Sequence, residues 1–304
     1  MALTTKSLGG HISGSSIQGK VRGGETSTRS LLFLVLLWLS LLIAVGFLVT
    51  LIVTTFVDGM SRLDSRLWTE YPASGPERAG ARPAILGSAW VIGATAAMAI
   101  PLGVAAAIHL EEFADRKNKL NRIIELNVQN LAAVPSIVYG LLTLAFLGMF
   151  AVANKNMVIV AATALGMLIL PVIIIATREA LRAVPEEIRQ GSMALGATRL
   201  QTVWRNTLPA AVPGIATGAI LALSRALGEA APLLLLGGLV FVSFDPNGIL
   251  SGYTTLPIQI FNWTGRPQAE FHELASAASI LLLGILIAMN ALAIFIRNRF
   301  QQRW

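Results

Sequence analysis

Residues 178–232 read REALRAVPEEIRQGSMALGATRLQTVWRNTLPAAVPGIATGAILALSRALGEAAP, and this stretch decides the fold. Its first part, residues 178–209, is charged and amphipathic within an otherwise apolar chain, and is named here the polar segment. Its second part continues into an apolar helix that carries Arg225 and Glu229. Charged residues inside a membrane span are costly and usually functional. The stretch therefore predicts a membrane protein that docks a partner at the polar segment and uses the two charges within a span.

The composition of the whole chain is also that of a membrane protein. Of its 304 residues, 55% are hydrophobic and only 13% are charged, and the mean hydropathy is +0.69. A soluble domain carries about twice that charged fraction. The absence of cysteine excludes disulfides, thiolate metal sites and cysteine nucleophiles. The net charge of +7 fits Lys and Arg retained on one side of a membrane better than it fits nucleic-acid binding.

Six apolar stretches are long enough to cross a bilayer, which takes about 20 helical residues. They are residues 31–57, 85–110, 126–153, 157–177, 210–242 and 274–296. The first is longer than the apolar core of a signal peptide, so an uncleaved anchor is expected. The third is the most polar, and its polar groups should face protein or water rather than lipid. These stretches predict an all-α membrane protein with six transmembrane helices.

The basic residues predict the orientation. They concentrate before the first span, after the second, in the polar segment and after the sixth span. All four groups fall on one side if there are six spans, so both termini and the polar segment are expected in the cytoplasm. The predicted organisation is a disordered tail (1–30), a first transmembrane helix (31–57), an external loop (58–84), a transmembrane domain (85–297) that includes the polar segment, and a cytoplasmic tail (298–304).

The polar segment is predicted to form two short helices around a glycine turn. Gly196 suits the left-handed conformation that ends a helix. Thr198 followed by Gln201 matches a capping box that starts a second helix. Leu200 and Trp204 then fall on one face of that helix. On this pattern alone, an amphipathic linker at the membrane surface fits as well as a docking site.

The polar segment resembles the EAA loop of ABC-importer permeases. That pattern is Glu-Ala-Ala, three residues, Gly, nine residues, an apolar residue, one more residue, then Leu-Pro. Gly196 and Leu208-Pro209 match at the right spacing, whereas Gln190-Gly191-Ser192 replaces Glu-Ala-Ala and Asn206 replaces the apolar residue. In the family this loop inserts into a groove of a cytoplasmic ATPase. The resemblance thus implies ATPase contacts by Gln190, Gly191, Ser192, Leu195, Gly196, Ala197, Leu200 and Trp204.

Three further stretches resemble the phosphate-importer permeases. They are NLAAVPSIVYG (130–140), SRALGEAAP (224–232) and LPIQIFNW (256–263), the last being closer to the PstA type than to the PstC type. Together the resemblances cover about residues 85–297. They imply a type I ABC importer (MetI-like) fold in a bacterial plasma membrane. They also imply a PstC-like permease partner, two copies of a PstB-like ATPase that binds ATP and Mg, and a PstS-like phosphate-binding protein outside. The chain itself is then expected to be no enzyme and to hold no cofactor.

Arg225 lies about 16 residues beyond Pro209, or roughly 24 Å along a helix. Glu229 follows at i+4, so that both side chains are predicted to share one helix face, beside the small residue Ser224. One interpretation is an internal ion pair that only neutralises two costly charges. The other is an anion path, in which the forked guanidinium binds phosphate and Glu229 holds it in place or accepts a proton. The resemblance to phosphate permeases favours the path.

Two alternatives of function stay open. One is a permease for another oxyanion, such as molybdate or sulfate, and the other is a secondary transporter or channel that needs no ATPase. A membrane enzyme has no specific support, and no catalytic residue is predicted. Residues 14–20 read GSSIQGK, most of a P-loop, but Val21 follows where Ser or Thr is required. The three histidines, at positions 11, 109 and 272, lack the spacing of a metal site.

Overall fold

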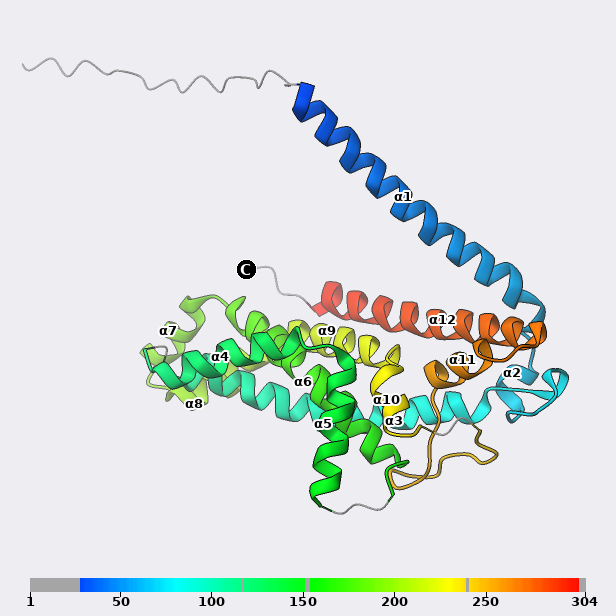
Figure 1. Ribbon diagram of the computed structural model, residues 1–304. Coiled ribbons are helices and arrows are strands. Elements are labelled where there is room, and N and C mark those ends of the chain that lie inside the picture. Colours follow the sequence, from blue (N-terminus) through cyan, green and yellow to red (C-terminus); the bar gives the residue numbers. More distant parts are fainter. Residues whose placement is uncertain (1–27, 116, 151–153, 239–240, 301–304) are drawn as a thin grey trace, which may run out of the picture. The chain divides into compact units, whose positions relative to one another are not determined.

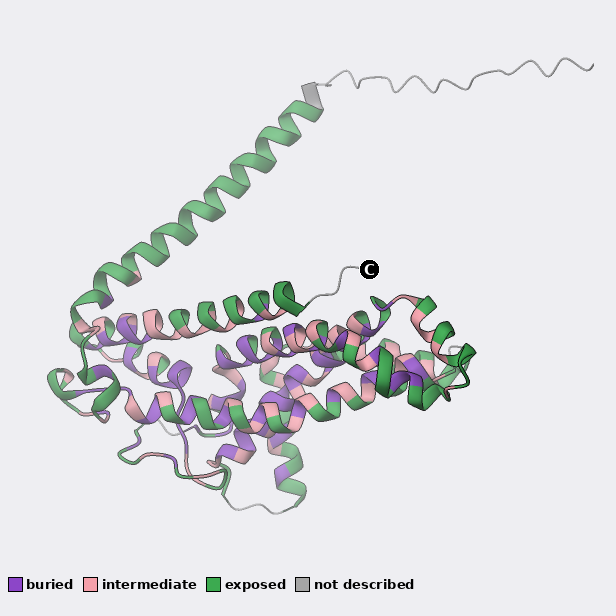
Figure 2. Ribbon diagram, turned by 180° about the vertical axis from the view of Figure 1, so that it is seen from behind, coloured by how far each residue is buried: buried purple, intermediate pink, exposed green. Residues whose placement is uncertain are grey.

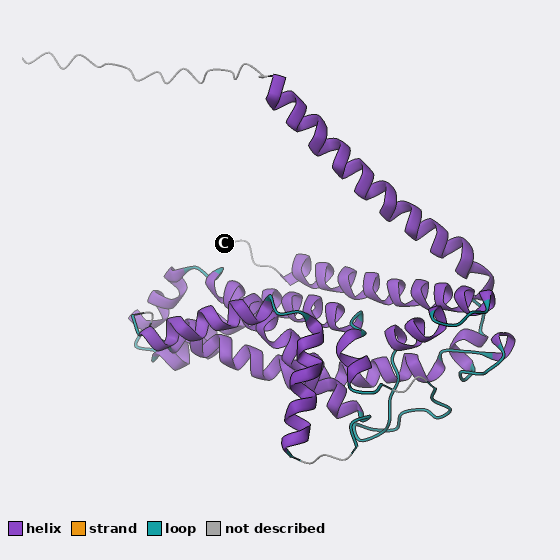
Figure 3. Cartoon of the chain, viewed as in Figure 1, coloured by secondary structure: helices purple, strands orange, loops and turns teal. Residues whose placement is uncertain are grey.

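The computed structural model describes residues 28–115, 117–150, 154–238 and 241–300. In these ranges every regular element is a helix, as predicted (Figure 3). The chain divides into two compact units, residues 1–52 and 53–304. Of the tail predicted for residues 1–30, positions 1–27 lie outside the described residues. Positions 301–304 of the predicted C-terminal tail also lie outside them.

Helix α1 (Thr28–Gly59) carries the first predicted span and extends from the first unit into the second. It holds no charged residue between Ser30 and Val57. By length and composition it is one of the helices able to cross a membrane. The external loop predicted for residues 58–84 contains three short elements, which are η1 (Met60–Arg62), α2 (Arg66–Thr69) and η2 (Pro76–Arg78).

Four long helices form the core of the second unit (Figure 1). They are α3 (Arg82–Ile108), α6 (Val158–Arg182), α9 (Leu208–Leu227) and α12 (Ala269–Phe300). Helix α6 packs between α3 and α9, and α12 packs on α9. Buried side chains concentrate in the first three helices and in the first half of α12 (Figure 2).

Small residues let the backbones of α6 and α9 approach closely. A Cβ atom on Gly218 would lie 2.5 Å from the Cβ of Ala176, and one on Gly214 would lie 2.8 Å from the Cβ of Ala180. Such close approach maximises van der Waals contact, which is the main attraction between helices in lipid. The spacing of the two glycines therefore sets how α9 sits on the central helix.

The third predicted span is not a straight helix. The structure has α4 (Lys119–Ala132) and α5 (Ser136–Met149), whose axes differ by 111°. Pro135 lies between them and lacks the N–H that would continue the helix, and it pushes the residue before it out of the helical conformation. The described residues therefore contain five helices that could span a membrane, or six if this bent pair counts as one.

The fifth predicted span, residues 210–242, is also interrupted. Helix α9 ends at Leu227, and the short helix α10 (Ala231–Leu235) follows with Pro232 in its first turn. The stretch LPIQIFNW (256–263) lies in the next helix, α11 (Leu256–Thr264). Leu256, Ile258 and Trp263 are fully buried in this helix, which packs on α3 and α12, whereas Phe261 is exposed.

Gly87 of α3 allows the chain around Thr254 to pack directly on this helix. A Cβ atom at position 87 would overlap the carbonyl oxygen of Thr254. We expect Gly87→Ala to cost about 1–3 kcal/mol of stability, because the backbone must move apart. Gly93→Ala is the matched control, since its Cβ would meet nothing within 4 Å in the same helix. Thermal unfolding in detergent measures both variants, and equal melting temperatures would contradict the expectation.

Candidate functional site

The polar segment folds as two short helices around a glycine, as predicted. Helix α7 (Glu186–Ala194) ends at a turn in which Gly196 has a φ of +86°. Helix α8 (Arg199–Thr202) then begins with the predicted capping box. The Thr198 Oγ1 atom accepts a hydrogen bond from the Gln201 backbone N–H at 3.3 Å, and the Gln201 Oε1 accepts one from the Thr198 N–H at 2.9 Å. Helix α8 continues through a π-helical turn, η4 (Val203–Thr207), into α9.

Most of the predicted ATPase-contact residues lie at the surface. Leu195 is 91% exposed, and Leu200 and Trp204 are also exposed, together with the neighbouring Met193. Gln190, Gly191 and Gly196 are exposed as well. Large apolar side chains on an exposed surface are typical of a docking site.

Ser192 and Ala197 differ from the other predicted contact residues, because both are half-buried. The hydroxyl of Ser192 lies 2.9 Å from that of Thr202 and accepts a hydrogen bond from the Asn206 amide at 3.0 Å. Ser192 therefore joins α7 to α8 and η4. Its role in this structure is to hold the two short helices together.

A network of ion pairs, which the sequence did not reveal, lies where α3 meets the polar segment. Helix α3 ends in a π-helical turn, η3 (His109–Phe113), that carries Glu111 and Glu112. The Arg178 guanidinium lies 3.1 Å from the Glu111 carboxylate and 2.8 Å from that of Glu125 in α4. Arg182 lies 3.0 Å from Glu111. These pairs join α3, α4 and α6 at one end of the bundle.

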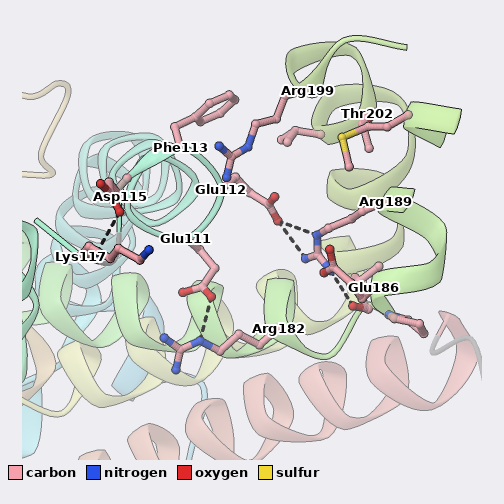
Figure 4. Close-up of a pocket in the computed structure, with 15 residues that line it drawn as sticks. Glu111, Glu112, Phe113, Asp115, Lys117, Arg182, Glu186, Arg189, Arg199 and Thr202 are labelled. Atoms are coloured by element: carbon pink, nitrogen blue, oxygen red, sulfur yellow. Dashed lines mark hydrogen bonds and ion pairs between the residues drawn. The ribbon is translucent and has the colours of Figure 1, made fainter. Parts of the chain in front are cut away.

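Arg189 of α7 makes the second part of this network. Its Nη2 lies 2.9 Å from Glu112 Oε1 and its Nε lies 3.3 Å from the same oxygen. The guanidinium also donates hydrogen bonds to the carbonyls of Val184 and Leu181, both at 2.8 Å. The Glu112 side chain is 6% exposed and that of Arg189 is 14% exposed. Figure 4 shows Glu112 pointing toward Arg189 and Glu111 toward Arg182.

The signal for this network was present in the sequence but incomplete. Two adjacent carboxylates end an apolar span, where an isolated charge would be costly, and the polar segment supplies several arginines. The partners of Glu111 and Glu112 are 67 to 77 positions away along the chain. These pairs form because α3 packs on α6. The periodicity of residues within one helix does not predict such contacts between helices.

A cavity of about 990 Å³ lies between η3 and the polar segment (Figure 4). Its charged lining is balanced. The acidic residues are Glu111, Glu112, Asp115 and Glu186, and the basic residues are Lys117, Arg182, Arg189 and Arg199. The formal charges of these eight residues therefore sum to zero.

The predicted pair of Arg225 and Glu229 forms, but at the end of a helix and not within one. Helix α9 ends at Leu227, and Gly228 follows as its cap. The Nε of Arg225 lies 3.9 Å from Glu229 Oε1, a distance too long for a hydrogen bond. The Arg225 side chain is 50% exposed, so Glu229 leaves much of the guanidinium accessible. Ser224 points the other way, because it is buried and its hydroxyl has no hydrogen-bond partner among the described residues.

Two of the stretches singled out in the sequence pack against each other. A Cβ atom on Gly140 would lie 2.9 Å from the Cα and from the carbonyl oxygen of Pro232. Tyr139 and Ala226 belong to the same buried apolar cluster. Residues 130–140 and 224–232 therefore form one region around the end of α9 that carries Arg225.

Comparison with known sequences identifies relatives over most of the chain. Residues 99–304 match the family described as "Binding-protein-dependent transport system inner membrane component". The "Phosphate transport system permease protein PstA 1" of Mycobacterium tuberculosis (strain CDC 1551 / Oshkosh) is 32% identical over 218 residues, covering 72% of this chain and 70% of that protein. The "Phosphate transport system permease protein PstA" of Haemophilus influenzae is 29% identical over 279 residues, covering 91% and 95%.

Comparison with solved structures finds the same arrangement of helices. A chain of the MetNI methionine ABC transporter, in an inward-facing conformation, superposes with a TM-score of 0.55 at 20% identity, covering 73% of this chain and 95% of that one. A chain of a bacterial alginate ABC transporter, in complex with a periplasmic protein, superposes with a TM-score of 0.65 at 15% identity, covering 90% and 96%. At these identities the likeness is one of fold.

Proposed function

Since the chain belongs to the family of binding-protein-dependent transport system inner membrane components, we propose that it is the permease subunit of an ATP-driven phosphate importer. The predicted all-α, MetI-like importer fold is confirmed by the family and by the two structural likenesses. The observation that carries the proposal is that one continuous stretch of chain contains both candidate sites. It exposes apolar residues in the polar segment and leads through α9 to the half-exposed Arg225.

In this proposal the polar segment is the cytoplasmic contact for an ATPase. The distribution of basic residues supports a cytoplasmic location for the segment and for both termini. Two copies of a PstB-like ATPase bind ATP and Mg, and one of them receives Leu195, Leu200 and Trp204 in a surface groove. The chain hydrolyses no ATP itself. ATP-driven closure of the ATPase pair acts on the permease because the pair binds the inward- and outward-facing states with different affinity.

Arg225 is proposed to contact phosphate in a path enclosed by this chain and a PstC-like permease. A guanidinium supplies a permanent charge and a forked set of donors that fit a phosphate oxygen pair. Glu229 stays near enough to weaken the attraction, which favours release of the ion after entry. A PstS-like protein on the outer face delivers the phosphate and supplies the selectivity.

The substrate and the energy source are tested together by reconstitution. Liposomes that contain this subunit, the partner permease and the ATPase, with the binding protein outside, are expected to accumulate labelled phosphate only when ATP is enclosed. ADP in place of ATP is the control. Labelled sulfate or molybdate at the same concentration is expected to stay at background.

The two alternatives give different outcomes in this assay. Accumulation of sulfate or molybdate in place of phosphate identifies a permease for another oxyanion. Entry of phosphate with ADP, or without the ATPase, identifies a secondary transporter or channel. The first outcome would contradict the proposed substrate, and the second would contradict the proposed energy source.

A further inference from the structure

We propose that Arg189 is a positioning residue, whose ion pair with Glu112 ties the ATPase-contact helix α7 to the end of α3 and so transmits its movement to the bundle. The inference rests on the proposed function of the polar segment. It concerns a contact within this chain, and it adds to the docking role a specific connection between the docking helix and a spanning helix.

The first support is the geometry of the guanidinium. Its nitrogens contact one carboxylate and two backbone carbonyls at 2.8 to 2.9 Å, so the side chain is held on several sides. The two carbonyls belong to Leu181 and Val184, at the end of α6 and just beyond it. Arg189 therefore joins three elements, which are α7, the end of α6 and the η3 turn of α3.

The second support is how little else attaches α7. None of its residues is fully buried, and of its apolar side chains only Ile188 packs partly on a buried cluster, the one around Leu181 and Val203. Ser192 bonds α7 to α8 and η4, which belong to the same polar segment. Within the described residues, the Arg189–Glu112 pair is the ion pair that connects α7 to α3.

The third support is the surroundings of the pair. Glu112 lies in one π-helical turn, and a second π-helical turn follows α7 along the chain at residues 203–207. Such turns interrupt the regular hydrogen bonds of a helix and occur frequently at functional sites. The cavity of about 990 Å³ between η3 and the polar segment gives α7 room to move toward α3.

The position next to Arg189 strengthens the case. The next residue, Gln190, is exposed and uncharged. Because the Gln190 amide is neutral, Arg189 is the residue that makes the ionic contact of this part of α7. The guanidinium contacts Glu112 in η3, in addition to the carbonyls of Leu181 and Val184.

The test measures coupling in the complete reconstituted importer, as phosphate transported per ATP hydrolysed. Arg189→Gln and Glu112→Gln are each expected to lower this ratio at least tenfold while ATP hydrolysis and co-purification of the ATPase persist. The double variant is expected to resemble either single one, because each removes the same pair. Arg189→Lys retains the charge and is expected to restore part of the ratio.

Glu186→Gln is the matched control. Glu186 also lies within 3.4 Å of Arg189, but its side chain is 62% exposed, and surface pairs of this kind contribute little. It is expected to leave the ratio unchanged. An unchanged ratio in both Arg189→Gln and Glu112→Gln would overturn the proposal. If the unaltered complex hydrolyses ATP without transporting phosphate, the proposed function is wrong. That result is distinguishable from a failure of the proposal for Arg189.

A second measurement applies even if a variant transports poorly for other reasons. The chain has no cysteine, so Glu187→Cys in α7 and His109→Cys in η3 accept one spin label each. The distance between the labels is expected to be narrowly distributed in the assembled complex. Arg189→Gln is expected to broaden the distribution and Glu186→Gln is not. A distribution that stays narrow in Arg189→Gln would contradict the tether.

Discussion

Arg225→Gln is expected to reduce phosphate uptake to background while the importer still assembles. The substitution keeps a hydrogen-bond donor but removes the charge and the fork. Hydrogen bonds to charged groups contribute about 1.5–3 kcal/mol each, so losing a two-pronged contact corresponds to a reduction in transport of roughly a hundredfold or more. The side chain is half exposed and its contact with Glu229 is long, so the fold does not depend on it.

The controls for this prediction separate charge from position. Arg297→Gln removes the same charge from an exposed site in the last turn of α12 and is expected to transport normally. Arg225→Lys keeps the charge without the fork and is expected to retain part of the uptake. Uptake is measured with labelled phosphate in vesicles, and assembly by co-purification of the partner subunits. Normal uptake by Arg225→Gln would show that the pair with Glu229 is only structural.

Trp204→Ala combined with Leu195→Asp is expected to abolish association of the ATPase. Exposed aromatic residues are the usual hot spots of interfaces, and truncating one costs about 2 kcal/mol or more. A carboxylate at position 195 adds a charge that the partner's groove would have to desolvate. Both side chains are exposed in the subunit, so that the fold should be unaffected.

Co-purification from detergent measures this association. Leu250→Asp is the control, because Leu250 is an exposed apolar residue in the chain between α10 and α11, far from the polar segment in the sequence. It is expected to leave the ATPase bound. Retention of the ATPase by the double variant would remove the docking role from the polar segment. Deleting residues 200–204 is a less specific test, because Thr202 and Val203 are buried.

The sequence predicted the features that depend on local chemistry. The apolar stretches became long helices, Gly196 took the left-handed conformation, and Thr198 and Gln201 formed the capping box. Each of these follows from residues within one or two turns of each other. The EAA-like spacing likewise found the segment that exposes Leu195, Leu200 and Trp204.

What the sequence did not predict depends on how helices meet. The apolar run across Pro135 satisfies the length of a span, yet the chain bends there by 111°. The end of α9 at Leu227 falls inside the stretch predicted as one span, because averaging over a span does not detect a cap at Gly228. The partners of Glu111 and Glu112 come from other helices, so that they required the packing of the bundle.

The π-helical turn at residues 203–207 has a geometric consequence for Arg225. A π turn holds one residue more than an α turn, and α9 extends from Leu208 to Leu227 with Pro213 inside it. Releasing that extra residue into regular helix would advance α9 by one position, a rotation of about 100° and a translation of about 1.5 Å. The guanidinium would then leave its present face. A change of register at residues 203–207 would therefore change the direction in which the far end of α9 presents its positive charge.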